Sequence, residues 1–156
     1  MLVSGYYYPS ARLDIAMSAP AALPLVGDAL RYTVCPPGAR LLLKRTAQAM
    51  FAPAPLPDTF FAAMPRSMLT RPVQIRAEAE DAALMVPAVT RLRAHYPELR
   101  MPVSIFAGAG DKIVDVDGHS ARLHQDVPHS SLTIKPDAGH MVHYLIVKKF
   151  LLRSMG

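Results

Sequence analysis

The chain of 156 residues has a single cysteine and no tryptophan. One cysteine cannot form an intramolecular disulfide, which excludes a disulfide-stapled fold and fits a reducing compartment. No apolar run approaches the roughly 20 residues that a membrane-spanning helix needs. Met1 leads into the chain without the basic segment that opens a secretory signal. We therefore expect a cytoplasmic protein without a membrane partner.

Acidic residues are fewer than basic ones, 12 against 17, and the formal net charge is +5. A nucleic-acid-binding domain usually gathers its basic residues into one patch and places aromatic side chains among them. Here the basic residues are scattered singly along the chain, as they are on a solvated surface. The charge pattern therefore predicts no nucleic-acid partner.

Histidines are frequent near the end of the chain, at His119, His124, His129, His140 and His143. Their spacing matches no zinc-binding signature, and carboxylates are not interleaved with them as ligands would be. We therefore expect no metal site, and no motif points to another cofactor.

The chain divides into three regions by composition. Residues 1–10 look like a short buried strand, over 1–5, that leads into an irregular segment. Residues 11–100 hold most of the 15 prolines and read as a series of helices, predicted over 23–32, 39–51, 58–64, 72–85 and 87–95. In the fourth of these helices we expect Val73, Ala77, Ala83 and Leu84 to face the core.

Residues 101–156 alternate between strand and helix. The pattern predicts strands over 102–107 and 131–135 and helices over 116–125 and 141–155, with Leu123 facing inward. This order implies parallel strands joined by right-handed crossovers. Functional loops of such sheets lie beyond the carboxyl ends of the strands.

Two residues that handle protons follow these strands. Asp111 comes just after the first, in a loop with Gly108 and Gly110, and His140 comes just after the second, behind Gly139. A hydrolytic histidine takes a proton from a nucleophile and returns it to a leaving group. A carboxylate behind the histidine orients it and stabilises its charged form. We therefore predict that Asp111 and His140 form an acid–base pair.

Three segments carry a resemblance to a known family. They are Pro102-Val-Ser-Ile-Phe-Ala-Gly-Ala-Gly-Asp-Lys-Ile-Val114, Gly118-His-Ser-Ala-Arg-Leu123 and Pro136-Asp-Ala-Gly-His-Met-Val-His143. Together they resemble the C-terminal portion of the α/β-hydrolase fold, whose triad runs nucleophile, acid, histidine along the chain. The resemblance implies an α/β fold with a partial parallel sheet, Asp111 as the triad acid and His140 as its base. It also implies that residues 11–100 form a helical cap (lid) region and that 101–156 are the C-terminal part of the core.

The nucleophile of that family is missing from the sequence. It would stand in a Gly-x-Ser-x-Gly elbow, and no serine of this chain has glycines on both sides at that spacing. We therefore expect a truncated hydrolase of an ester, a lactone or a similar small apolar substrate, inactive by itself. An aspartate nucleophile, as in epoxide hydrolases and dehalogenases, is an open alternative. A catalytically inactive interaction module that self-associates through an exposed strand edge is another.

Three further residues are candidates for binding the substrate. Tyr6 and Tyr7 follow the first strand, and His143 lies on the first turn of the last helix beside His140. Their positions predict that they line the pocket, although a buried aromatic cluster would explain the tyrosines equally.

Overall fold

A computed structural model describes residues 1–11 and 19–146 of the chain. The chain divides into two units, which we describe separately. Unit 1 comprises Met1–Tyr8, Ala47–Leu56 and the described part of Leu92–Gly156. Unit 2 comprises the described part of Pro9–Thr46 and Pro57–Arg91. The expected cap of residues 11–100 contains unit 2 apart from Pro9 and Ser10. It also contains Ala47–Leu56 and residues 92–100 of unit 1, and its role as a cap stays a prediction.

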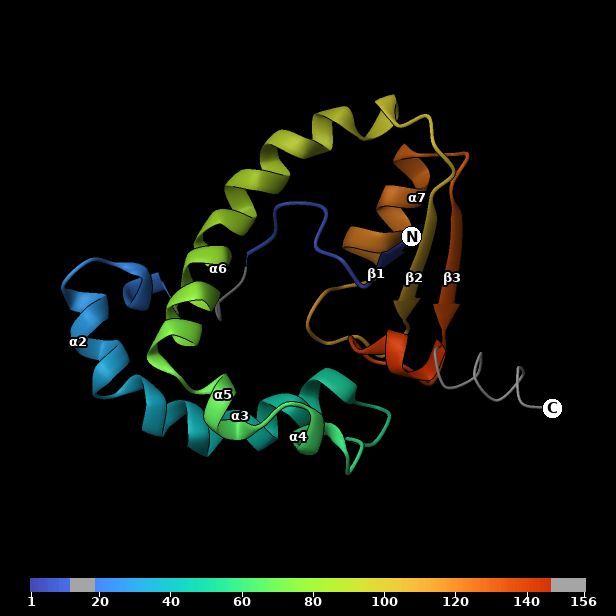
Figure 1. Cartoon of the computed structure of the whole chain (residues 1–156). Helices are drawn as coiled ribbons and strands as arrows, with labels where there is room; N and C mark the ends of the chain where they lie inside the picture. The colour runs from blue at the N-terminus through green and yellow to red at the C-terminus, as the bar shows by residue number, and fades with distance from the viewer. Residues whose placement is uncertain (12–18, 147–156) are drawn as a thin grey trace. The chain divides into compact units, whose positions relative to one another are not determined.

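Unit 1 holds three parallel strands in the order β1-β2-β3, namely β1 (Leu2–Val3), β2 (Ser104–Gly108) and β3 (Ser131–Lys135) (Figure 1). Ile105 of the central strand pairs with Leu2 on one side and with Leu132 on the other. Its side chain is fully buried. The predicted parallel sheet is thus confirmed, with β3 at its expected bounds and β2 beginning two residues after Pro102, which has no N–H to donate.

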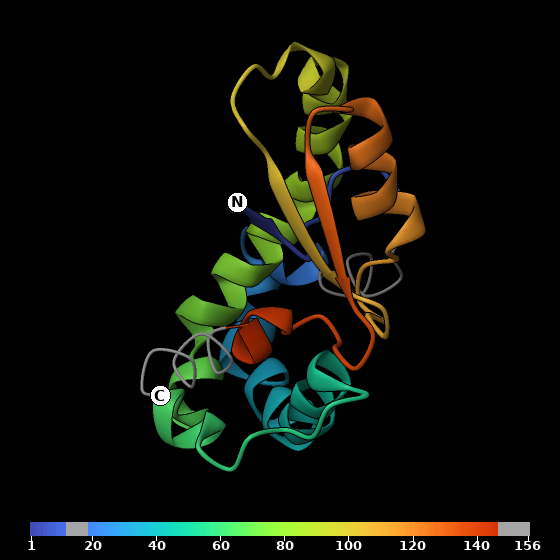
Figure 2. The same cartoon turned by 90° about the vertical axis from the view of Figure 1, so that its right-hand side faces the viewer.

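One face of this sheet is covered by the segment between β2 and β3. A π-helical turn, η3 (Asp117–Ala121), runs directly into α7 (Arg122–Asp126), which lies alongside β2 and β3 (Figure 2). Leu123 of α7 is buried against Ile105, as predicted. Burial of such aliphatic side chains, worth about 1.5–3 kcal/mol each, holds the layers together.

The segment that leaves β1 is fixed to η3 and α7 by polar contacts. The backbone N–H groups of Tyr7 and Tyr8 both donate to Nδ1 of His119, at 3.1 and 3.3 Å. The Tyr8 hydroxyl donates to Asp126 at 2.6 Å, and the Arg122 guanidinium lies 4.2 Å from the Tyr8 ring centroid. His119 is therefore a buried structural acceptor, which its sequence context did not predict.

A helix end from earlier in the chain also belongs to unit 1. Helix α3 (Cys35–Phe51) ends within Ala47–Leu56, where the N–H of Met141 donates to the carbonyl of Met50 at 3.1 Å. The rings of Phe51 and Tyr144 meet edge to face at 4.9 Å. Residues 142–146 are helical, and the rest of the predicted helix 141–155 lies outside the described residues.

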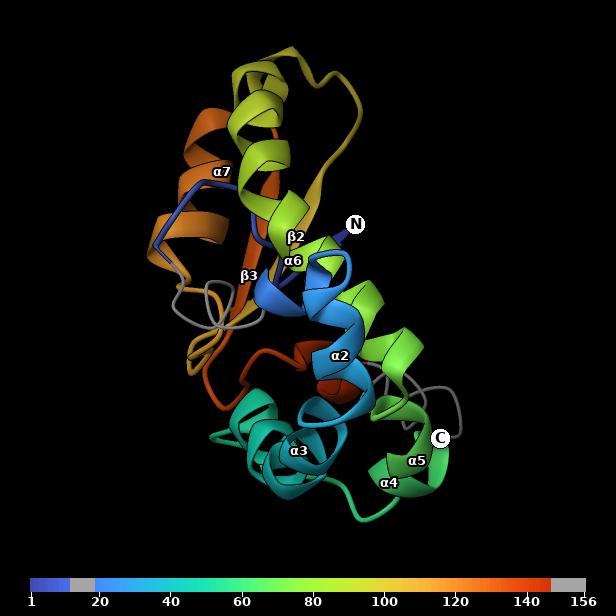
Figure 3. The same cartoon turned by 90° about the vertical axis from the view of Figure 1, so that its left-hand side faces the viewer.

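Unit 2 is built from short helices and one long one (Figure 3). In chain order its elements are η1 (Ala19–Ala22), α2 (Val26–Tyr32), the first part of α3, α4 (Phe60–Ala63), α5 (Arg66–Leu69) and most of α6 (Pro72–Leu92). A 3-10 segment in unit 1, η2 (Arg93–Glu98), follows α6.

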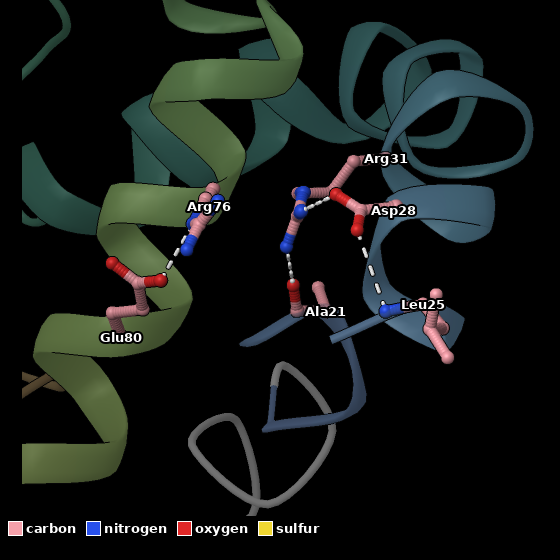
Figure 4. Close-up of polar contacts among 6 residues, drawn as sticks. All are labelled: Ala21, Leu25, Asp28, Arg31, Arg76 and Glu80. Atoms are coloured by element: carbon pink, nitrogen blue, oxygen red, sulfur yellow. Dashed lines mark hydrogen bonds and ion pairs between the residues drawn. The ribbon is translucent and has the colours of Figure 1, made fainter. Parts of the chain in front are cut away.

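Polar contacts tie the first elements of unit 2 together (Figure 4). The buried Arg31 donates to the carbonyl of Ala21 at 2.6 Å and pairs with Asp28. The same carboxylate accepts the N–H of Leu25 at 3.3 Å, at the start of α2. Arg31 therefore links η1 to α2, and its charge is balanced within α2.

Two predictions about the helices were wrong. Pro87 was expected to open a separate helix, but α6 runs through it. Proline removes one backbone hydrogen bond there, and the carbonyl left over, that of Ala83, is on an exposed residue where water can bond it. All four expected core residues of this helix, Val73, Ala77, Ala83 and Leu84, are exposed, whereas Ala79 and Val89 are buried.

No helix in the described ranges has both the length and the apolar character needed to cross a bilayer.

Candidate active site

Asp111 is held in place by its own loop. It follows β2, and its N–H donates to the carbonyl of Gly108 at 3.1 Å. Its Oδ1 accepts the N–H groups of Ile113 and Val114 at 2.8 and 2.9 Å, the side chain-to-backbone turn that aspartate favours. The side chain is only 1% exposed. Asp111 is therefore a buried carboxylate with one oxygen committed to the backbone.

His140 is delivered by the loop after β3, which packs tightly against the Asp111 loop. The N–H of Gly110 donates to the carbonyl of Ala138 at 2.9 Å and joins the two loops. Gly139, just before His140, has no room for a side chain because an added Cβ would strike the backbone carbonyl of Ala52. Gly108 is equally confined by the carbonyls of Ala138 and Gly139. These close approaches explain why glycines flank the two site residues.

The two predicted site residues meet. Nδ1 of His140 lies 2.9 Å from Oδ2 of Asp111, and the imidazole is 24% exposed. Since an ionised carboxylate can only accept, Nδ1 carries the proton in this pair. Nε2 then faces away from Asp111, and no group in residues 1–11 or 19–146 makes a hydrogen bond to it. The imidazole is thus oriented with a free basic nitrogen.

The electrostatics of the pair keep the carboxylate ionised. Burial of Asp111 works to raise its pKa, but the hydrogen bonds from His140, Val114 and Ile113 outweigh that effect and lower the pKa below its usual value of 3.8. Hydrogen bonds to the charged form act in this direction. Asp111 is therefore negative at neutral pH and can stabilise a positive imidazole.

This lowered pKa predicts a pH dependence of stability. In acid, the unfolded chain takes up a proton at Asp111 at a higher pH than the folded chain does, so the free energy of unfolding rises with pH across that window. The contribution of Asp111 should be complete above about pH 4 and should be lost as pH falls through the lower pKa of the folded state. Urea unfolding of the native chain and of Asp111→Asn between pH 2 and 6 measures it. Identical acid limbs of the two stability curves would contradict the prediction.

His143 lies on the helical turn that follows His140, and its ring is 4.9 Å from that of Tyr144. Partial burial and the charge that His140 can carry both lower the pKa of His143. His143 is therefore within electrostatic reach of the pair, and its part in substrate binding stays a prediction.

The structure places Tyr6 and Tyr7 against η3. The Tyr6 ring lies 4.6 Å from the His119 ring, and Tyr7 is buried in the core of unit 1. The Tyr7 hydroxyl has no hydrogen-bond partner in the described part of the chain, and burial raises its pKa. Tyr6 thus contacts His119 through its ring and Tyr7 through its backbone N–H, and a role of either in substrate binding stays a prediction.

A serine–histidine contact lies elsewhere in unit 1. Nδ1 of His124 is 2.8 Å from Oγ of Ser130. Ser130 directly precedes β3, so this contact lies at the amino ends of the strands, whereas Asp111 and His140 follow their carboxyl ends. Across the described ranges, no serine or cysteine makes a hydrogen bond with His140, and no three His, Cys, Asp or Glu side chains group as metal ligands would.

Comparisons with known proteins identify the fold. No protein-family model matches the sequence, and no curated protein matches it either. Solved structures that are similar to this chain include the following three. MGS-M2, an α/β-hydrolase enzyme from a Medee basin deep-sea metagenome library, has a TM-score of 0.55 at 13% identity and covers 95% of this chain and 51% of its own.

The other two structures agree with this result. A bromoperoxidase from Bacillus anthracis has a TM-score of 0.54 at 15% identity, over 96% of this chain and 52% of its own. Est816, described as an N-acyl homoserine lactone degrading enzyme, has a TM-score of 0.52 at 17% identity. The match covers 89% of this chain and 54% of Est816. The chain thus spans about half the length of these enzymes. Most of the chain therefore has the fold of about half of an α/β-hydrolase, which confirms the resemblance found in its sequence.

Proposed function

We propose that this chain supplies the acid–base part of a nucleophile–His–Asp triad, with His140 as the base and Asp111 as the acid. The observation that carries the proposal is the 2.9 Å contact between His140 Nδ1 and Asp111 Oδ2, backed by the two amides that hold the other carboxylate oxygen. A carboxylate fixed in this way selects the imidazole tautomer with a basic Nε2.

The chemistry follows from this arrangement. Nε2 of His140 takes a proton from the attacking nucleophile, and Asp111 stabilises the imidazolium that forms. The same proton then passes to the leaving group, after which water repeats the sequence and releases the acid product. The imidazole is partly exposed, so a nucleophile and a substrate can reach Nε2. The substrate class we propose is an ester, a lactone or a similar small apolar molecule.

We propose that the nucleophile lies outside these 156 residues. The sequence has no Gly-x-Ser-x-Gly elbow, and no described serine or cysteine is bonded to His140. In this proposal residues 11–100 serve as the cap that covers the substrate.

A labelling experiment tests the location of the nucleophile. The 156-residue chain alone should resist a fluorophosphonate probe, and any hydrolysis of p-nitrophenyl acetate should be the same in His140→Ala. Joined to the residues encoded upstream in its gene, the protein should be labelled and should lose activity in His140→Ala but not in the exposed control His129→Ala. Labelling of a serine within the 156 residues would refute the external nucleophile. An extended enzyme that keeps its activity in His140→Ala would refute the assignment of His140 as the base.

A further inference from the structure

The helices α2 and α3 expose an unusual number of apolar side chains. Between residues 23 and 42 of unit 2, seven large apolar residues are more than half exposed: Leu23, Leu25, Val26, Tyr32, Val34, Leu41 and Leu42. Single exposed apolar residues are common, but seven of them within one stretch of the chain are a candidate interaction surface. We call these residues, with Lys44 and Arg45, the α2–α3 patch.

On α3 the patch is continuous because of helical spacing. Leu41 is three residues from Lys44 and four from Arg45, and residues at these separations are neighbours on a helix surface. Leu42 is likewise three residues from Arg45. Leu41 is 81% exposed, and an added Cβ at Gly38, one turn before it, would meet nothing within 4 Å. This face of α3 is therefore open, with two leucines flanked by two cations.

The charge of α3 has one sign, since none of its residues from Cys35 to Phe51 is acidic. No acidic residue occurs between positions 29 and 57, and the acid that precedes this stretch, Asp28, is paired with Arg31. Lys44 and Arg45 are exposed and make no ion pair within the part of the chain that the structure describes. The α3 face of the patch therefore combines apolar surface with positive charge that is not neutralised locally.

A leucine elsewhere in the same unit provides a contrast to this combination. Leu84 of α6 is 63% exposed, which is comparable with the leucines of α3. Its neighbours three and four residues earlier are Asp81 and Glu80, so it is flanked by acids. An anionic surface would attract the α3 face and repel the Leu84 face.

We propose that the α2–α3 patch docks this protein on the surface of a bilayer that contains anionic lipids. Aliphatic side chains with lysine and arginine beside them are the composition of helices that lie in a membrane interface. Leu41 and Leu42 enter the boundary of the acyl chains, and Lys44 and Arg45 meet the lipid phosphates. Tyr32 is suited to the headgroup level, where tyrosine is enriched. A fluid interface accepts side chains that protrude singly, whereas a protein partner needs a matching surface.

This binding is peripheral and needs no membrane-spanning segment. It departs from the expectation of no membrane partner, which considered only spanning segments and secretory signals. It does not depend on the proposed hydrolase function, because the patch uses neither Asp111 nor His140. It would bring a hydrolase of small apolar substrates to the phase in which such substrates concentrate.

Vesicle sedimentation of the full 156-residue chain tests the proposal. We expect binding to vesicles of mixed phosphatidylglycerol and phosphatidylcholine, loss of that binding at high salt, and no binding to pure phosphatidylcholine. Lys44→Gln with Arg45→Gln should weaken binding about thirtyfold, since each basic residue near an anionic surface contributes about one factor of five. Leu41→Ser with Leu42→Ser should weaken it at least tenfold.

Leu84→Ser is the matched control and should bind as the native chain does, because it removes an equally exposed leucine from an acidic face. All variants change exposed residues, so circular dichroism and thermal melting should stay near native. Equal binding to both vesicle types, no binding to either, or native binding by the Leu41/Leu42 variant would overturn the proposal. So would a dimer of the native chain that these leucine changes dissociate while vesicle binding stays absent, because the patch would then cover a second copy.

Discussion

Replacing Asp111 with asparagine in the upstream-extended enzyme is expected to lower kcat by about 10⁴-fold, as removal of the triad charge does in serine proteases. Asparagine keeps the size of the side chain but loses the charge. It can also present its NH₂ group to Nδ1 of His140, which then becomes the acceptor and leaves the proton on Nε2. A histidine in that tautomer cannot take a proton from a nucleophile.

The expected loss of kcat can be distinguished from a loss caused by unfolding. The amide oxygen of asparagine can still accept from Ile113 and Val114, which now donate to Asp111 Oδ1 at 2.8 and 2.9 Å, so the loop should persist. Nitrogen NMR of the imidazole should therefore report a change of tautomer at His140 in a protein that still unfolds cooperatively. Its free energy of unfolding at neutral pH should fall only by the contribution of the missing Asp111 charge.

Asp115→Asn is the matched control for this experiment. Asp115 lies in the same loop and accepts the N–H of Gly118 at 2.6 Å, but no contact joins it to His140. It should keep kcat within a few-fold of native. An Asp111→Asn enzyme with near-native kcat, or equal losses in both variants, would contradict the triad assignment.

The Asp111–His140 pair could be predicted because local patterns fix it. Each residue follows an apolar strand, β2 or β3, and parallel neighbouring strands bring the residues at their carboxyl ends together. The apolar runs that predicted β2 and β3 are paired in the structure, with Ile105 opposite Leu132. Strand order and the direction of these loops therefore follow from short segments of sequence.

The faces of the helices could not be predicted in the same way. Helix α6 is rich in alanine, and its apolar residues surround the helix, so no single stripe marks the buried side. Ala79 is buried, whereas the larger Val73 and Leu84 are exposed. Only the packing of unit 2 selects among these faces, and the continuation of α6 through Pro87 depends on that packing too.

The packing of residues 47–56 against the His140 loop could not be predicted from the sequence either. Proline marks where α3 stops, but nothing in Ala47–Leu56 indicates that its backbone meets Gly139 and Met141. Such contacts join positions some ninety residues apart through backbone carbonyls, which carry no sequence pattern. The glycine at 139 is the one local sign of a close approach, and it does not identify the partner.

His119 is the residue whose role the sequence concealed most completely, because its partners are backbone amides more than a hundred residues away. We expect His119→Leu to lower the free energy of unfolding by about 2–4 kcal/mol. The leucine leaves the N–H groups of Tyr7 and Tyr8 buried without an acceptor, and each such group costs about 1–3 kcal/mol. Amide hydrogen exchange at Tyr7 and Tyr8 should accelerate as well.

His119→Asn separates the acceptor role from simple packing. The Oδ1 of asparagine is bonded to Cγ, as Nδ1 of histidine is, so it lies the same number of bonds from the backbone. It can accept both N–H groups. The free energy of unfolding in urea should therefore be lower for His119→Asn than for the native chain but higher than for His119→Leu. This order is expected although leucine fills more of the buried volume than asparagine does. The exposed His129→Leu should stay within about 0.5 kcal/mol of native. If Leu were more stable than Asn, packing rather than the two hydrogen bonds would hold the segment that leaves β1.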